Sequence, residues 1–545
     1  MGTTNRKRAS APKYLSPGQL TLEGFETPFE QHLDPKNRWV VLAGLIPWDD
    51  ICSIYLKQTG GTSNTGRPPL SPRIVLGSLI IKHLCNLDDR ETVDQITENM
   101  YMQYFLGYPS FTTASPFDAS LFVSFRKILG IENVNAINEK IVALKTHLGA
   151  LRKDEKATNN EQGPTDDISS SPPQVPKCTN DNVAEVGSIG NAADVVQVKE
   201  NKGRVIYDAT ACPQDIAFPT DLNLLSDARE KSEQLIDLLY DQSLHHKKPR
   251  TYREVARTVY LKTAQKKNKS GKVIRKAVGQ QLNYLRRNLG SINTLLDVFQ
   301  GIPLKAKEYK YLLVINTLYD QQKTMFDSKT HSIEHRIVSI HQPHVRPIVR
   351  GKSQAKTEFG AKIHVSLIDG ISFLDELSWD AFNEGSHMMN YVEQYHKRFG
   401  CYPRELLADK IYCTRANRTA LKEKGIKLVA KPLGRPSAVQ EHVSPGERNP
   451  IEGKFGQAKT AYGLNRIRAR LPNTSESWIA SIFLVLNLVK LAWAALPCLI
   501  DRTFKMFFSK IDCVYLFHLA REICNKEILN PVLSYSRPIT LRNTD

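Results

Sequence analysis

Three acidic residues stand where their carboxylates could share divalent metal ions. Asp208 follows a short apolar strand expected at 205–207, and Asp409 lies near the end of a second such strand, in "RELLADKIY". Glu452 lies near the start of a helix, in "ERNPIEGKF". Carboxylate oxygens suit Mg²⁺, which keeps water and phosphate oxygens as its other ligands. Two such ions can activate the attacking oxygen and stabilise the leaving oxygen of an in-line phosphoryl displacement. If they meet at one sheet edge, Asp208, Asp409 and Glu452 are therefore predicted to be catalytic and to bind two Mg²⁺ ions, with Mn²⁺ able to substitute.

Each acid also has an ordinary structural explanation. Asp208 could be a turn residue at a strand end, and Asp409 could cap a helix. Glu452 follows Asn449 by three residues, with Pro450 between them, which is the spacing of a capping box. On spacing alone the capping role is preferred for Glu452, so these acids do not by themselves establish a metal site.

The elements that would position these acids alternate between strands and helices. This alternation predicts an α/β domain with a mixed sheet over residues 203–500. The apolar segment 478–500 is interrupted by Asn487 and Lys490 and is expected to end at Pro497, which favours a buried helix over a membrane span. The further strands are expected at 311–320, in a hairpin over 358–380 that turns at Asp369-Gly370, and at 426–432, with helices over 222–300 and 414–425.

The N-terminal part of the chain reads as helical. An all-α domain is expected over 39–150, with a Ser-Pro helix start at 71–72, an N-cap at Asp88 or Asp89, and a stop at Gly107. Short helices joined by tight turns fit a DNA-binding module, but they also fit any small helical domain. An acidic disordered linker is expected over 151–202, and tails over 1–38 and 501–545.

Charge points to a polyanionic partner. The 545-residue chain carries a formal charge of +18, and residues 246–287 hold fourteen Lys and Arg against one acid. Charge this one-sided favours a phosphate-backbone groove over a solvated helix face. The DNA contacts predicted from this pattern are Lys266, Lys267 and Lys269, and, before the hairpin, Arg346, Arg350 and Lys352, for which a solvated loop is a close alternative.

The remaining sequence signals concern compartment and metal type. Nine cysteines without a CxxC pair favour a reducing compartment, and the N-terminus lacks the apolar region of a signal peptide. Four histidines crowd into residues 331–344, but without an HExxH motif or a nearby cysteine they are expected to be polar loop or strand residues rather than zinc ligands. Trp379 is expected in the core, with stacking on an unpaired base as the alternative.

Several blocks of the sequence resemble a known family. "GRPPLSPRIVLGSLIIKHLCNLDDRETVDQITENMYMQYFLGY", "VIYDATACPQDIAFPTDLNLL", "LLADKIY" and "ERNPIEGKFGQAKTAYGL" are similar to blocks of DDE transposases of bacterial insertion sequences, most of all to insertion-sequence family five. In the related YREK signature an arginine precedes the glutamate by four positions and a lysine follows it by seven. Arg448, Glu452 and Lys459 match this spacing, whereas Pro445 stands where the signature has tyrosine.

The resemblance implies a fold and an activity. It implies an RNase H-like catalytic core with a helical, basic insertion at about 222–345, with Asp208, Asp409 and Glu452 as the catalytic acids. It also implies DNA contacts by Arg448 and Lys459. The implied protein binds the terminal inverted repeats of its element, cleaves the ends and transfers them to target DNA, as a homo-oligomer on DNA in the bacterial cytoplasm at the nucleoid, without a membrane partner. A catalytically silent DNA-binding derivative or repressor, and another RNase H-like two-metal nuclease, remain as alternatives.

Overall fold

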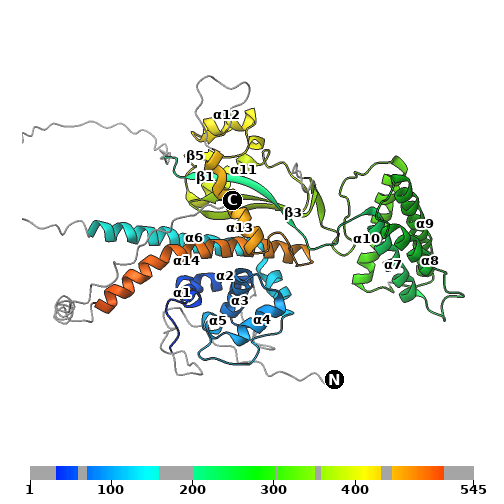
Figure 1. Ribbon diagram of the computed structural model, residues 1–545, viewed down its shortest axis with the longest axis horizontal. Helices are drawn as coiled ribbons and strands as arrows, with labels where there is room; N and C mark the ends of the chain where they lie inside the picture. The colour runs from blue at the N-terminus through cyan, green and yellow to red at the C-terminus, as the bar shows by residue number, and fades with distance from the viewer. Residues whose placement is uncertain are drawn as a thin grey trace, which may run out of the picture. The chain divides into compact units, whose positions relative to one another are not determined.

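The computed structural model describes residues 32–58, 70–158, 200–301, 303–349, 357–430 and 445–508 (Figure 1). Two compact units divide the chain at Leu488. Among the described residues, the second unit contains only the end of the last helix, so the following paragraphs concern the first unit.

The N-terminal part is helical, as its sequence predicts. Asp88 is the N-cap of α4 and forms a capping box with Glu91, and Pro72 begins α3 directly after Ser71. Phe105 packs against both Trp39 and Trp48 in the interior of this helical group. The helices are α1 (Arg38–Leu45), α2 (Trp48–Gln58), α3 (Pro72–Leu84), α4 (Asp89–Glu98), α5 (Met100–Phe105) and α6 (Leu121–Thr158), the last kinked at Gly130.

In the described part of the chain, a mixed sheet of six strands forms the second part. The central strand β1 runs antiparallel to β3 on one side and parallel to β5 on the other, and β5 pairs with β6 in parallel. The predicted hairpin is confirmed, because β3 and β4 are joined by Asp369 and Gly370, both at positive φ. The strands are β1 (Arg204–Pro213), β2 (Arg346–Val349), β3 (Thr357–Ile368), β4 (Ile371–Ser378), β5 (Glu405–Leu407) and β6 (Lys427–Val429).

Two sequence predictions about this region are wrong. The strand before Asp208 does not end there, because β1 continues to Pro213 in unbroken register with β3. The segment 311–320 is not a strand but lies inside the helix α10 (Ala306–Ser328). Its buried residues Leu312, Ile315 and Leu318 recur every three positions, as on one face of a helix, although its aromatic and β-branched composition is typical of strands.

Between β1 and β2 the chain forms a helical insertion with its own apolar core (Figure 1). Helices α7 and α9 pack against each other, and α8 and α10 pack against both. Leu225, Leu235, Leu285 and Ile315 are completely buried in this core. The four helices are α7 (Asp221–Leu239), α8 (Arg253–Ala264), α9 (Gly271–Leu296) and α10.

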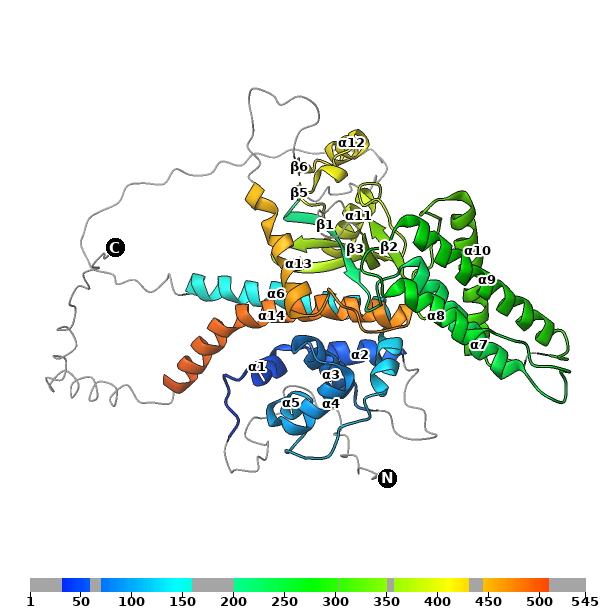
Figure 2. The same ribbon diagram turned by 45° about the vertical axis from the view of Figure 1, so that its right-hand side comes forward.

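Helices cover the sheet and complete the fold. The first part of α14 lies beside α6 (Figure 2). Tyr391 of α11 packs against Tyr207 of β1, and Asn487 of α14 binds both Asn138 of α6 and the backbone of Ser372 on β4. The helices are α11 (Met388–Phe399), the 3₁₀ helix η3 (Lys410–Tyr412), α12 (Arg415–Glu423), the 3₁₀ helix η4 (Pro445–Arg448), α13 (Asn449–Ala461) and α14 (Pro472–Phe508).

The apolar C-terminal helix is a core helix, as predicted, although it does not end at Pro497 but runs on to Phe508. Its stretch Pro472–Ala492 is long and apolar enough to cross a membrane, but 78% of its most apolar window is buried inside the protein. The helix pair α1 and α2 passes the same test of length and composition only if the bend between them is ignored.

The predicted linker and tails lie mostly outside the described residues. Residues 151–158 of the expected linker are helical, because α6 continues to Thr158. Residues 159–199, and the tails at 1–31 and 509–545, are outside the described part of the chain.

Candidate active site

Asp208 lies in the middle of β1, on the strand that pairs with both β3 and β5. Successive side chains of a strand point to opposite faces of the sheet, so Asp208 faces away from Tyr207 and the helix α11 that packs on it. The Asp208 carboxylate accepts a hydrogen bond from the N–H of Ala209 at 2.8 Å. The side chain is 22% exposed, which leaves one carboxylate accessible at the centre of the sheet.

Asp409 and Asp208 meet at one guanidinium group. Arg448, the last residue of η4, lies 3.2 Å from a carboxylate oxygen of Asp409 and 3.7 Å from one of Asp208. Asp409 follows β5 by two residues and caps η3, where its side chain accepts a hydrogen bond from the N–H of Lys410. Because β5 is the parallel neighbour of β1, the two aspartates reach the same region from adjacent strands, as their positions in the sequence predict.

Glu452 lies in the first turns of α13, where its side chain is exposed. The predicted capping box is wrong, because the N-cap of α13 is Arg448 rather than Asn449 and no side-chain capping bond forms. Glu452 therefore keeps its carboxylate available, and its charge acts on Asp208. Whether Glu452 joins the two aspartates as a third metal ligand stays a prediction.

The charges around Asp208 act in opposite directions on its pKa. Burial raises the pKa of the Asp208 carboxyl, and the nearby negative charges of Asp409 and Glu452 raise it further. The hydrogen bond from Ala209 and the charge of Arg448 act to lower this pKa. The balance is a raised pKa, which means that the site favours an additional positive charge beside Asp208.

The carboxylate oxygens of Asp208 and Asp409 suit a hard divalent cation, but in this structure they lie beside the guanidinium of Arg448. Within the described part of the chain, no three His, Cys, Asp or Glu side chains are arranged closely enough to hold a metal ion. Asp208 and Asp409 instead share the positive charge of Arg448, whose Nε is buried without a hydrogen-bond partner. The acids therefore fit a divalent cation on condition that this guanidinium moves away from them.

Arg204 and Glu447 also belong to this region, and sequence reasoning missed both. They form an ion pair that ties the start of β1 to η4, directly before Arg448. Arg204 also lies 3.9 Å from Glu405 on β5. Glu447 stands beside the "RNPIEGK" motif, but nothing in the sequence pairs it with a residue more than 200 positions away.

The other predicted DNA contacts lie in different settings. Lys459 lies half-buried in the last turn of α13. Arg346, on β2, donates to the carbonyl of Val345 and lies 3.4 Å from Asp380, so its guanidinium is held within the protein. Arg350 and Lys352 lie outside the described residues. Lys266, Lys267 and Lys269 are exposed between α8 and α9.

The four histidines of residues 331–344 do not form a metal site in the described structure. His341 contacts the hydroxyl of Tyr311, and His344 packs edge-on against Trp379 at 4.4 Å. Burial, with the nearby positive charges of Lys310 and Arg346, lowers the pKa of His344 to about 4. Trp379 donates to Glu476 at 2.8 Å, but its side chain is only partly buried, so it does not lie in the core as expected.

A buried polar cluster lies on the opposite face of β1 from Asp208. The side chain of Asp375 is completely buried and binds Arg398 at 2.6 Å and His364 at 3.1 Å. His364 stacks on Tyr391 with ring centroids 3.6 Å apart, and both rings contact Tyr207, the neighbour of Asp208. The acid within the apolar run "ISFLDELS" is the sequence signal that could have indicated this cluster.

Comparison with known proteins associates two parts of the chain with one class of protein. Residues 406–489 match the family model described as transposase DDE domain, and residues 27–128 match the model described as transposase domain (DUF772). Both models describe transposases. The first match contains Asp409, Arg448 and Glu452, and the second contains α1 to α5.

A curated relative and the solved structures add little to these matches. A Rhizobium meliloti protein, described as uncharacterized protein ORF8 in nfe locus, is 30% identical over 129 residues, which are 24% of this chain and 60% of that protein. No solved structure matches the chain. Together the matches support a transposase of a bacterial insertion sequence, while insertion-sequence family five is not confirmed.

Proposed function

We propose that this protein is a DDE transposase that cleaves the ends of its insertion sequence and transfers them to target DNA. The observation that carries the proposal is the convergence of Asp208 and Asp409 on Arg448, within and beside the segment that matches the transposase DDE domain. The mixed sheet, with β1 at its centre, supports an RNase H-like core. The motif spacing around Glu452 supports a relationship to insertion-sequence family five.

Some residues of the site would bind metal ions, and others would bind DNA. Asp208, Asp409 and Glu452 would hold two Mg²⁺ ions, or Mn²⁺ in their place. When bound, such ions activate the attacking oxygen and stabilise the leaving oxygen of the phosphodiester. Asp208 and Asp409 act as ionised ligands and orient the reacting groups from two adjacent strands. Arg448, once released from the aspartates, and Lys459 hold phosphate oxygens of the DNA strand, as guanidinium and ammonium groups commonly do.

The rest of the chain would bind and position DNA. We propose that α1 to α6 recognise the terminal inverted repeats and that the exposed lysines between α8 and α9 contact backbone phosphates. Phosphate contacts fix register and orientation, while base contacts supply sequence preference. We further propose that the protein acts as a homo-oligomer on DNA, in the bacterial cytoplasm at the nucleoid.

Incubation with element-end DNA, target DNA and Mg²⁺ tests the proposal. The proposed transposase gives strand transfer, another RNase H-like nuclease gives cleavage without transfer, and a silent derivative or repressor gives binding alone. Asp208→Asn keeps the shape of the side chain and removes its charge. We expect this variant to lose cleavage and to bind end DNA almost as well as the natural protein. Unchanged cleavage would refute the metal-binding role of Asp208.

A further inference from the structure

An exposed tyrosine at the start of α8 contacts two arginines of the helical insertion. The guanidinium carbon of Arg250 lies 4.6 Å from the centre of the Tyr252 ring, and that of Arg287, on α9, lies 4.7 Å from it. Arg287 also lies 4.9 Å from the ring of Tyr284. Tyr252 is 37% exposed. Cation–π attraction therefore holds two guanidinium groups near one another at the protein surface.

These two arginines differ from Lys248 and Arg253 in having no acid to neutralise them. Lys248 and Arg253 both pair with Asp237 of α7, at 2.8 and 3.0 Å. Among the residues that the structure describes, no carboxylate lies within 4 Å of the guanidinium of Arg250 or of Arg287. Two like charges held together without a counter-charge repel each other, so this arrangement favours an anionic ligand.

The backbone at this position is held in an unusual conformation. Tyr252 has φ 54° and ψ 27°, in the left-handed region that residues other than glycine rarely adopt. Such a conformation costs free energy and persists only where the surrounding structure imposes it, which happens most often at functional sites. The ring therefore has a fixed place from which to orient the two arginines.

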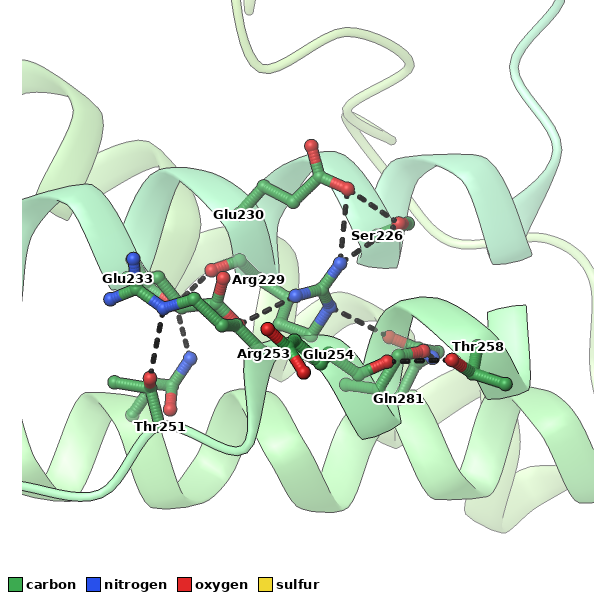
Figure 3. Close-up of polar contacts among 12 residues, drawn as sticks. Ser226, Arg229, Glu230, Glu233, Thr251, Arg253, Glu254, Thr258 and Gln281 are labelled. Carbon is green, nitrogen blue, oxygen red and sulfur yellow. Dashed lines mark hydrogen bonds and ion pairs between the residues drawn. The ribbon is translucent and has the colours of Figure 1, made fainter. Parts of the chain in front are cut away.

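A buried polar network joins the helices next to Tyr252 (Figure 3). Arg229 of α7, only 1% exposed, donates to Glu233 at 2.6 Å and to Gln281 of α9 at 3.2 Å. Gln281 in turn donates to the carbonyl of Ala256 on α8 at 3.0 Å. These bonds join α7, α8 and α9, and the ion pair between Arg253 and Asp237 fixes the first residue of α8 to α7. Arg287 is thus on a helix, and Arg250 lies three residues before a helix, whose relative positions are set by buried bonds.

We propose that Arg250 and Arg287, oriented by Tyr252, form a phosphate-binding site that grips two neighbouring phosphates of a DNA backbone. Guanidinium groups donate paired hydrogen bonds to phosphate oxygens, and they lose less solvation than ammonium groups when they do so. Prior orientation by the tyrosine lowers the entropy lost on binding. The partner, duplex DNA, rests on the proposed function, whereas the site itself rests on the contacts described above.

The salt dependence of duplex binding by the full-length protein tests the site. Each phosphate contact contributes about 0.9 to the slope of log affinity against log salt. We expect Arg250→Ala and Arg287→Ala each to flatten the slope by about 0.9, and the double variant by about twice that amount. The control is Arg286→Ala, which removes an equal charge from an adjacent exposed position of α9 and should leave the slope nearly unchanged.

Tyr252 is a positioning residue, and its replacement separates orientation from charge. Tyr252→Leu keeps both arginines but removes the ring, and we expect duplex affinity to fall about three- to ten-fold. Tyr252→Phe keeps the ring and should restore the natural affinity. A general loss of helical structure in the leucine variant would appear in its circular dichroism, and the two arginine variants, which leave the buried network intact, would then decide the question.

Several outcomes would overturn the site. Slopes unchanged in the double variant, or flattened equally by Arg286→Ala, would show that no specific phosphate site exists there. Loss of binding to phosphatidylglycerol vesicles, with duplex binding unaffected, would assign these arginines to a membrane surface instead. If the natural protein fails to bind duplex at all, the proposed function fails. If the natural protein binds duplex but the Arg250 and Arg287 variants show the same salt slope as Arg286→Ala, the proposed function stands and the phosphate site fails.

Discussion

The position of the Arg448 guanidinium leads us to a specific prediction about metal binding. It lies 3.2 Å from Asp409 and 3.7 Å from Asp208, in the place where a cation shared by these acids would be attracted. A metal ion must therefore compete with it. Replacing Arg448 by glutamine removes the competing charge and keeps a polar side chain of intermediate length, so we expect Arg448→Gln to bind divalent metal more tightly than the natural protein.

The size of this effect follows from the geometry and the exposure of the groups. Opposite unit charges about 4 Å apart attract by about 4 kcal/mol at an effective dielectric constant of about 20. The Asp409 side chain is 58% exposed, so solvent screens its pair to the range of surface ion pairs, at most about 1 kcal/mol. Asp208 and Arg448 are more covered, at 22% and 23%. The two pairs together contribute about 1–2 kcal/mol, which corresponds to a factor of about 5–30 in metal affinity.

Titration of the DNA-free protein with Mn²⁺, followed by electron paramagnetic resonance, measures this affinity. Arg466→Gln is the matched control, because Arg466 pairs with Asp215, an acid outside the proposed site, at 3.0 Å. Addition of end DNA should reverse the order, since Arg448→Gln also removes a proposed phosphate contact. Equal Mn²⁺ affinities for Arg448→Gln, the control and the natural protein would refute the competition between guanidinium and metal.

Two further substitutions test the DNA surface and the buried support of the sheet. Lys266, Lys267 and Lys269 lie in the exposed loop between α8 and α9. Replacing them with alanine should weaken binding to all duplex sequences alike and flatten the slope of log affinity against log salt. A loss of binding confined to the element's ends would show instead that the loop reads sequence. Asp375→Asn should lower the free energy of unfolding, measured in urea, by about 3 kcal/mol, because it leaves the largely buried charge of Arg398 without its closest partner. The control is Asp380→Asn, at an exposed position, which should change the free energy of unfolding by less than about 0.5 kcal/mol. Burial acts to raise the pKa of Asp375, but its hydrogen bonds and the charge of Arg398 lower it below its ordinary value, so its stabilising contribution is present above the unfolded pKa and is lost as pH falls through the folded pKa. The natural protein should therefore lose stability on acidification below about pH 4 more steeply than Asp375→Asn, and parallel pH profiles would contradict this account.

Local signals in the sequence determined those features that depend on neighbouring residues. Three such features were predictable because their causes act within a few residues. The Asp369-Gly370 turn needs positive φ, and the start of α3 places proline where its missing N–H costs nothing. The N-cap at Asp88 needs only a short side chain that accepts a hydrogen bond. The position of Asp409 after a short strand was predictable for the same reason.

Tertiary structure decided what depends on residues far apart in the chain. The extension of β1 past Asp208 requires β3, whose Gly360 pairs with Pro213, and no local pattern in "ATACP" indicates it. Helix α10 has a strand-like composition, and its true state follows from burying one face in the core of the insertion. The sequence identified both aspartates and Arg448 separately, but their common contact arises only because β1 and β5 are neighbours in the sheet and the segment before α13 returns to them. Spacing along a chain determines local conformation, whereas the place where distant charges meet is determined by how the strands pair and the helices pack.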